Sequence, residues 1–143
     1  MNEDGPRIEF YIPKIEEIFS RGIPINLAKR GESWSEQQLG EYAKKIGVYV
    51  IHHDNKIKYV GKTDEKTMSF GMRLRREFQQ SASQNRHLFP KLLRLKIPPE
   101  IKVTFFDSEE ISKYVKAIGS NLSDIGKIRI FEQILIQLCN PNI

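Results

Sequence analysis

The sequence predicts an α+β domain in which a small, largely antiparallel sheet is packed by helices. Two β-rich runs, GVYVIHH and KIKYVGK, are separated only by Asp54 and Asn55, a pattern typical of a β-hairpin. A third β-rich run, IKVTFFDS, comes later in the chain, after segments with helical character. This order of elements favours an antiparallel sheet flanked by helices over a wound parallel sheet.

The segment before the hairpin is expected to be mainly helical. Pro13 favours a short helix that starts near it, and the stretch RGIPINLAKRG that follows is interpreted as loop or short strand. Ser33 and Glu36 have the spacing of a capping box, which predicts a helix that ends before Gly47. We therefore expect an N-terminal accessory extension here.

The segments after the hairpin carry the usual signals for helix starts and ends. They predict, in order, a polar loop over 63–70, a basic helix over 71–80, a helix over 87–95 closed by Pro98-Pro99, the strand IKVTFFDS, a helix from Asp107 or Ser108 to about Ile118, and a last helix from Asn121–Ser123 to about Cys139. The predicted organisation is an extension over 1–46 and a three-stranded domain over 47–143.

The composition indicates a soluble, intracellular protein, and we expect a cytoplasmic one. The single cysteine, Cys139, can form neither an internal disulfide nor a cysteine-based metal site. No apolar run reaches the roughly 18 residues that a membrane span needs, and the start MNEDGPRIEF lacks the layout of a signal peptide. No membrane partner is expected.

The positive charge is concentrated in one part of the chain. The net charge is +5 overall, but seven basic residues lie between positions 73 and 96 against one acid, Glu77. Such a segment can follow a phosphate backbone, or it can be an ordinary solvated helix face. The candidate nucleic-acid-binding residues beside Arg73 are Arg75, Arg76, Arg86, Lys91, Arg94 and Lys96.

Two tyrosines of the hairpin, Tyr49 and Tyr59, are either packing residues or parts of one site. A two-residue turn at Asp54-Asn55 would pair Tyr49 with Val60 and send the two rings to opposite faces of the sheet. A three-residue loop that includes Lys56 would bring both rings to one face. If the hairpin carries an active site, we expect the three-residue loop.

The last helix contains a carboxylate in an apolar sector. On a 3.6-residue wheel, Glu132 lies among Ile125, Ile128, Leu135, Ile136 and Cys139, while Arg129, Gln133 and Gln137 form the polar stripe. A carboxylate that faces a core is costly unless it is paired or binds a metal. A buried ion pair, for which Arg73 and Arg94 are candidate partners, and a metal ligand are equally good interpretations.

A magnesium site does not require a cage of protein ligands, because Mg²⁺ keeps much of its hydration and takes one or two carboxylates. The run His52-His53-Asp54 is interpreted as turn chemistry, since adjacent strand residues point to opposite faces. His87 is interpreted as structural. Glu132 is therefore the candidate metal ligand.

Four short motifs occur in a recognisable order. GVY and YVGKT lie nine residues apart, and MRLRREF and FEQILIQLCNP follow. From Gly47 to the C-terminus, this pattern resembles the GIY-YIG nuclease family. The resemblance implies cleavage of DNA phosphodiesters by a three-stranded antiparallel sheet flanked by helices, with one divalent metal ion, Mg²⁺ or Mn²⁺, per active site.

The resemblance also implies roles for single residues. Tyr49 and Tyr59 match the motif tyrosines, and one of them, with Tyr49 preferred, would accept the proton of the attacking water. Arg73 would hold the scissile phosphate and neutralise charge in the transition state. Glu132 would bind the metal, which stabilises the leaving oxygen. Lys62 resembles an auxiliary lysine near the phosphate.

The chain departs from the family pattern at two places. Glu77 stands where many members have His or Tyr, so its carboxylate could act as a base or cap an ion pair. An asparagine expected about three residues after Pro141 would lie one residue beyond Ile143, so either Asn140 or Asn142 substitutes for it or the native chain continues past this point. These departures leave open a catalytically impaired nucleic-acid-binding module of nuclease ancestry, and an RNA nuclease is a third possibility. Double-strand cleavage would require two active sites and hence a homo-oligomer.

Overall fold

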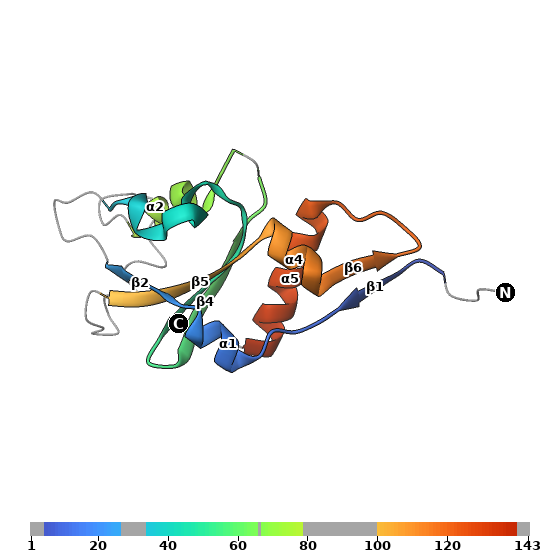
Figure 1. Ribbon diagram of the computed structural model, residues 1–143, viewed down its shortest axis with the longest axis horizontal. Coiled ribbons are helices and arrows are strands. Elements are labelled where there is room, and N and C mark those ends of the chain that lie inside the picture. The colour runs from blue at the N-terminus through green and yellow to red at the C-terminus, as the bar shows by residue number, and fades with distance from the viewer. Residues whose placement is uncertain (1–4, 27–33, 66, 79–99, 140–143) are drawn as a thin grey trace.

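The computed structural model describes residues 5–26, 34–65, 67–78 and 100–139, and its elements form one elongated molecule (Figure 1). The strands are β1 (Arg7–Phe10), β2 (Ile23–Asn26), β3 (Gly47–His53), β4 (Lys56–Thr63), β5 (Glu100–Asp107) and β6 (Val115–Ile118). The helices are α1 (Ile15–Ser20), the 3-10 helix η1 (Glu36–Lys44), α2 (Phe70–Phe78), α4 (Ser108–Tyr114) and α5 (Asp124–Cys139). In the part described, no helix is long and apolar enough to cross a membrane.

The α+β domain holds two sheets, so the expected single three-stranded sheet is wrong. One sheet has four antiparallel strands in the order β2-β5-β3-β4, and a second consists of β1 and β6 alone. The expectation of a mainly helical N-terminal extension is also wrong, because β1 and β2 lie within residues 1–46 and each joins one of the sheets. Strand β5, which corresponds to the predicted run IKVTFFDS, lies inside this sheet between β2 and β3.

Long-range pairing explains why these additional strands are hard to recognise in the sequence. Pro24 in β2 looks like a strand breaker, but β2 is an edge strand, where a missing N–H is tolerated. Strands β1 and β6 have four residues each and pair across more than 100 residues of sequence, with Arg7 opposite Ile118. Neither has a local partner that would mark it as a strand.

Two of the expected helices differ in detail. The segment before β3 is 3-10 rather than α-helical, since Gly40 breaks it with φ 59° and ψ −132°. Its cap is Ser35, whose hydroxyl accepts from the backbone N–H of Gln37, whereas Ser33 lies outside the described residues. The helix capped by Asp107 ends at Tyr114 rather than near Ile118, because the residues that follow pair with β1.

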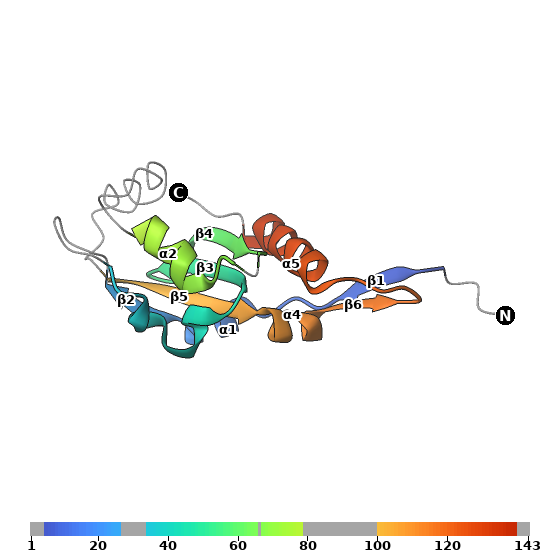
Figure 2. The same cartoon turned by 90° about the horizontal axis from the view of Figure 1, so that it is seen from above.

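The four-stranded sheet buries both of its faces. One face contributes Tyr49, Ile51 and Phe105 to a core that η1 and α2 cover with Leu39, Phe70, Leu74 and Phe78. The other contributes Val48, Val50 and Phe106 to a core that α1, α4 and α5 cover with Ile18, Ile111, Ile128, Phe131 and Leu135. Figure 2 shows α2 and α5 near the β4 side of the sheet. That edge is where two helices and a strand come together.

The hairpin turn is a tight two-residue turn, so the expected three-residue loop is wrong. Asp54 and Asn55 have φ of 53° and 56°, and His53 pairs with Lys56. The two tyrosines nevertheless share a face, because the register shifts next to Lys58, which is left unpaired as a bulge. Without that bulge, Lys58 would pair opposite Ile51 and point into the core.

A buried histidine joins the hairpin to the N-terminal segment. His52 is 2% exposed, and its Nε2 lies 2.9 Å from the Thr104 hydroxyl oxygen. The Thr104 hydroxyl donates its only proton to the carbonyl of Ile18, so His52 must donate from Nε2. Burial, with a smaller contribution from Lys102, lowers the pKa of His52 to about 4.

This depressed pKa makes stability dependent on pH. In the unfolded chain His52 takes up a proton near pH 6.5, whereas in the folded protein it does so only near pH 4. Between these two pH values unfolding is therefore accompanied by uptake of a proton. The folded state loses stability as the pH falls through that range. The loss is on the order of 3 kcal/mol. Urea unfolding at pH 7 and pH 4.5 measures it. His52→Gln should flatten the dependence, whereas the neighbouring His53→Gln should keep it; an equal slope in all three proteins would contradict the assignment.

Candidate active site

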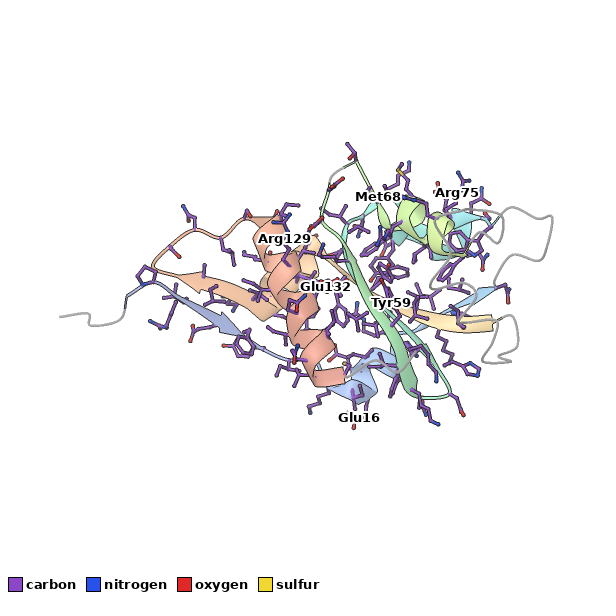
Figure 3. All side chains as sticks on the ribbon, turned by 180° about the vertical axis from the view of Figure 1, so that it is seen from behind. Glu16, Tyr59, Met68, Arg75, Arg129 and Glu132 are labelled. Atoms are coloured by element: carbon purple, nitrogen blue, oxygen red, sulfur yellow. The ribbon has the colours of Figure 1, made fainter. Side chains whose placement is uncertain are left out.

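A cleft at the β4 edge of the sheet brings together residues from three separate parts of the chain. Its volume is about 320 Å³, and it is lined by Tyr59, Lys62, Thr63, Asp64, Glu65, Met68, Arg73, Arg76 and Glu132. Five of these are site residues expected from the sequence: Tyr59, Lys62, Arg73 and Glu132 as catalytic residues, and Arg76 as a nucleic-acid-binding residue. Figure 3 shows Glu132 on α5 and Tyr59 on the neighbouring strand.

The edge position of β4 explains how both sides of the sheet contribute to one cleft. Tyr59 lies on the face of the sheet that α2 covers, because it packs against the core there. Lys62 lies on the other face, because it pairs with Val48, whose side chain belongs to the core under α5. The open side of an edge strand gives side chains of both faces access to the same space. Helix α2 then supplies Arg73 and α5 supplies Glu132.

Glu132 lies at the boundary between the core and the cleft. Its helix neighbours Phe131 and Leu135 are buried, whereas Glu132 is half-buried. Burial raises the pKa of the Glu132 carboxyl, and Asp64 adds to this; Lys62 and Arg73, together with a hydrogen bond from Gln133, oppose it. The carboxylate is therefore stabilised electrostatically by two of the cations that line the cleft, Lys62 and Arg73. The apolar sector that the helical wheel indicated is confirmed, with Glu132 at its edge.

The sequence interpretation missed a second carboxylate in the cleft. Asp64 Oδ2 accepts from Lys62 Nζ at 3.0 Å and from Arg129 Nε at 2.9 Å. Both cations lower the pKa of the Asp64 carboxyl, with the Arg129 hydrogen bond contributing most. The only local signal is the opposite charge of Lys62 two residues away, since Arg129 is distant in sequence. Asp64 therefore holds Lys62 beside the cleft and links it to α5.

The two tyrosines stand at different depths. Their ring centroids are 6.0 Å apart, which confirms that they share a face. Tyr59 is partly exposed and lines the cleft, whereas Tyr49 is fully buried behind it against Phe70. Of the two, Tyr59 is thus the tyrosine that the cleft exposes.

Gly61 makes room for both rings. A Cβ at this position would lie 2.5 Å from Cζ and from the hydroxyl oxygen of Tyr49, and 2.7 Å from Cε2 of Tyr59. Because Tyr49 is enclosed by the core, it has little freedom to move away. A side chain at position 61 must therefore displace one or both tyrosines.

We expect Gly61→Ala to destabilise the protein by about 1–3 kcal/mol, the usual cost of overpacking a core. The displaced ring should also change the fluorescence of the tyrosine pair. Urea unfolding measures the first effect. Gly5→Ala is the matched control, since a Cβ there meets no atom within 4 Å. Equal stability of the two variants would show that the tyrosine pair adapts to the added methyl group.

The basic residues are only partly described. Arg75 and Arg76 are exposed on α2, and Arg76 lines the cleft. Glu77 also belongs to α2, but its side chain is outside the described set. Arg86, Lys91, Arg94 and Lys96 lie outside the described residues, as do His87, Asn140, Pro141 and Asn142. The candidate phosphate-binding surface that can be placed is the exposed side of α2.

Three carboxylates are among the side chains that line the cleft. It combines the carboxylates of Glu132, Asp64 and Glu65 with open space for water, and oxygen ligands suit Mg²⁺ and Mn²⁺. Of these carboxylates, Asp64 is engaged by two cations, and Glu132 is the half-buried one. No group of three or more His, Cys, Asp or Glu side chains that could hold an ion is found within the described ranges.

The other polar group singled out in the sequence is placed away from this cleft. His52 points to the opposite face from Tyr49 and is buried, while Asp54 forms the hairpin turn.

Comparison with known proteins finds no match: no family model, no curated protein and no solved structure matches this chain.

Proposed function

We propose that this chain is a metal-dependent endonuclease of the GIY-YIG type that hydrolyses DNA phosphodiester bonds. The observation that carries the proposal is the gathering of Tyr59, Lys62, Arg73 and Glu132 around one cleft. These residues come from β4, α2 and α5, and all four match motif positions of the family that the sequence resembles. A cytoplasmic location accords with such an enzyme.

The cleft residues suit the binding of a phosphodiester. Arg73 and Lys62 offer positive charge to the phosphate oxygens, and Arg76 extends it toward the exposed side of α2. Because Asp64 already accepts hydrogen bonds from Lys62, a bound phosphate competes with Asp64 for this lysine. Arg73 then neutralises the charge that grows on the phosphoryl oxygens in the transition state.

Proton transfer is assigned to Tyr59. Its side chain lines the cleft and can meet an attacking water molecule, whereas Tyr49 is fully buried and supports the Tyr59 ring from behind. A phenol with an ordinary pKa near about 10 is a weak base, but neighbouring cations favour its phenolate. Lys62, Arg73 and Arg76 line the same cleft as Tyr59.

Glu132 is the residue assigned to the divalent cation. A bound Mg²⁺ or Mn²⁺ ion would supply neutralisation of charge on the leaving oxygen. The half-buried carboxylate is suited to this role, because its raised pKa shows that it lacks full compensation by the cations around it. Water and substrate oxygens would complete the ligand set, as is usual for Mg²⁺.

Nicking of a supercoiled plasmid in the presence of Mg²⁺, and its loss in a chelator, tests the proposal. A metal-dependent conversion to the open circular form is expected. Single-stranded DNA, duplex DNA and RNA, compared at one salt concentration, then identify the preferred substrate. Binding of duplex DNA without any cleavage would contradict the proposal and favour the nucleic-acid-binding module.

A further inference from the structure

The exposed apolar side chains of the protein are concentrated in one short segment. Among the described residues, seven large apolar side chains are exposed, and five of them lie within residues 8–15: Ile8, Phe10, Tyr11, Ile12 and Ile15. Single exposed apolar residues are common, but a group so close together in the sequence points to a surface that another molecule can cover. The surface belongs to β1 and to the residues that follow it.

Strand β1 has an open edge. It pairs with β6 on one side, and no described strand pairs with it on the other. Figure 1 shows the β1–β6 ribbon extending away from the four-stranded sheet, so the ribbon is accessible from several directions. An open edge presents unpaired backbone groups that can bind another strand.

The hydrogen-bond pattern shows which residues face that edge. The N–H of Tyr11 donates to the carbonyl of Tyr114 at 2.7 Å, so Tyr11 and every second residue before it direct their backbone groups toward β6. Ile8 and Phe10 therefore direct their backbone N–H and C=O groups to the open edge. The side chains of Ile8 and Phe10 also lie on one face of the ribbon, the same face as those of their cross-strand partners Ala117 and Val115.

We propose that β1 pairs antiparallel with β1 of a second copy of this chain, with the two-fold axis at Ile8. The result is a four-stranded sheet in the order β6-β1-β1-β6. This inference does not depend on the proposed function. In this register, Ile8 exchanges backbone hydrogen bonds with Ile8 of the second copy, and Phe10 lies opposite Pro6 of the second copy.

The charges of Arg7 and Glu9, on the other face of β1, favour a second copy of this chain as the partner. With the axis at Ile8, Arg7 of each chain lies directly opposite Glu9 of the other, in the closely spaced type of pair. An axis at Glu9 would instead place two like charges face to face. An axis at Phe10 would require Ile8 to pair with Ile12 of the second copy, and Ile12 lies beyond the end of β1. The segment Arg7-Ile8-Glu9 is thus complementary to itself only in the register proposed.

Sedimentation velocity of the full chain over a range of concentrations tests this dimer. The wild type should dimerise, and Ile8→Lys should weaken the dimer by about a hundredfold or more, because it removes apolar contact and places like charges at the axis. Leu138→Lys is the matched control: it replaces an exposed apolar residue of α5, outside β1, and should leave the dimer unchanged. Circular dichroism should show the same fold for every variant.

A charge reversal tests the register. Arg7→Glu should weaken the dimer by about tenfold, since it turns two attractive pairs into repulsive ones, and adding Glu9→Arg should restore most of the affinity. A wild type that stays monomeric at all concentrations would overturn the proposal. So would a dimer that withstands Ile8→Lys, or a double variant that dimerises no better than Arg7→Glu alone.

Discussion

Glu132→Gln is expected to reduce plasmid nicking by about a thousandfold or more while leaving the fold intact. The substitution keeps the size and shape of the side chain and removes the negative charge assigned to the metal ion. Losing the charge that positions the cation removes its stabilisation of the leaving oxygen, and electrostatic contributions of this kind are among the largest in catalysis. Initial nicking rates at saturating Mg²⁺ measure the effect.

The same substitution should raise the stability of the metal-free protein. The pKa of Glu132 is higher in the folded protein than in the unfolded chain, so at pH values above the unfolded-state pKa of this residue its ionised form destabilises the fold. A neutral amide removes that cost. Thermal unfolding in a chelator at pH 7.5 should therefore give a higher Tm for Glu132→Gln. Asp124→Asn is the control, because it removes a carboxylate from the first turn of the same helix at an exposed position. Wild-type nicking rates in Glu132→Gln would refute the assigned role.

Tyr59→Phe is expected to lower the nicking rate by about a hundredfold to ten-thousandfold, the usual range for loss of a general base. Phenylalanine preserves the ring contacts with Tyr49 and removes only the hydroxyl group of this cleft residue. The ring packing, and hence the stability of the protein, should change little. The rate at saturating substrate separates this loss from any loss of binding.

Tyr49→Phe is the matched variant for this experiment. Its hydroxyl is buried behind Tyr59, so its removal should affect the nicking rate much less than Tyr59→Phe does. Urea unfolding of both variants shows whether an effect on activity follows from an effect on stability. A larger loss of activity in Tyr49→Phe would reverse the assignment of the two tyrosines.

Several features could be predicted from the sequence because their signals are local. The β3–β4 hairpin and β5 are confirmed, as is the opening of the last helix, where the Ser123 hydroxyl accepts from the N–H of Gly126. Turn residues, β-branched runs and capping residues each act within a few positions. Glu132 was also recognisable locally, since a single helical wheel places it in an apolar sector.

Features that depend on distant contacts could not be predicted in this way. Strands β1, β2 and β6 gain their hydrogen bonds only from segments far along the chain. The bulge at Lys58 keeps this lysine from pointing into the core beneath the hairpin, and it brings the two tyrosines to one face despite the two-residue turn. Asp64 becomes recognisable as a cleft residue only once α5 brings Arg129 to it.

Binding of Mn²⁺, followed by electron paramagnetic resonance during a titration, tests most directly whether Glu132 holds a cation in this cleft. The free ion gives a strong signal that weakens on binding, so the stoichiometry and affinity follow without any DNA. We expect one ion per chain for the wild type and for Asp124→Asn, and loss of that ion in Glu132→Gln. Equal binding of Mn²⁺ by the wild type and Glu132→Gln would contradict the proposed site.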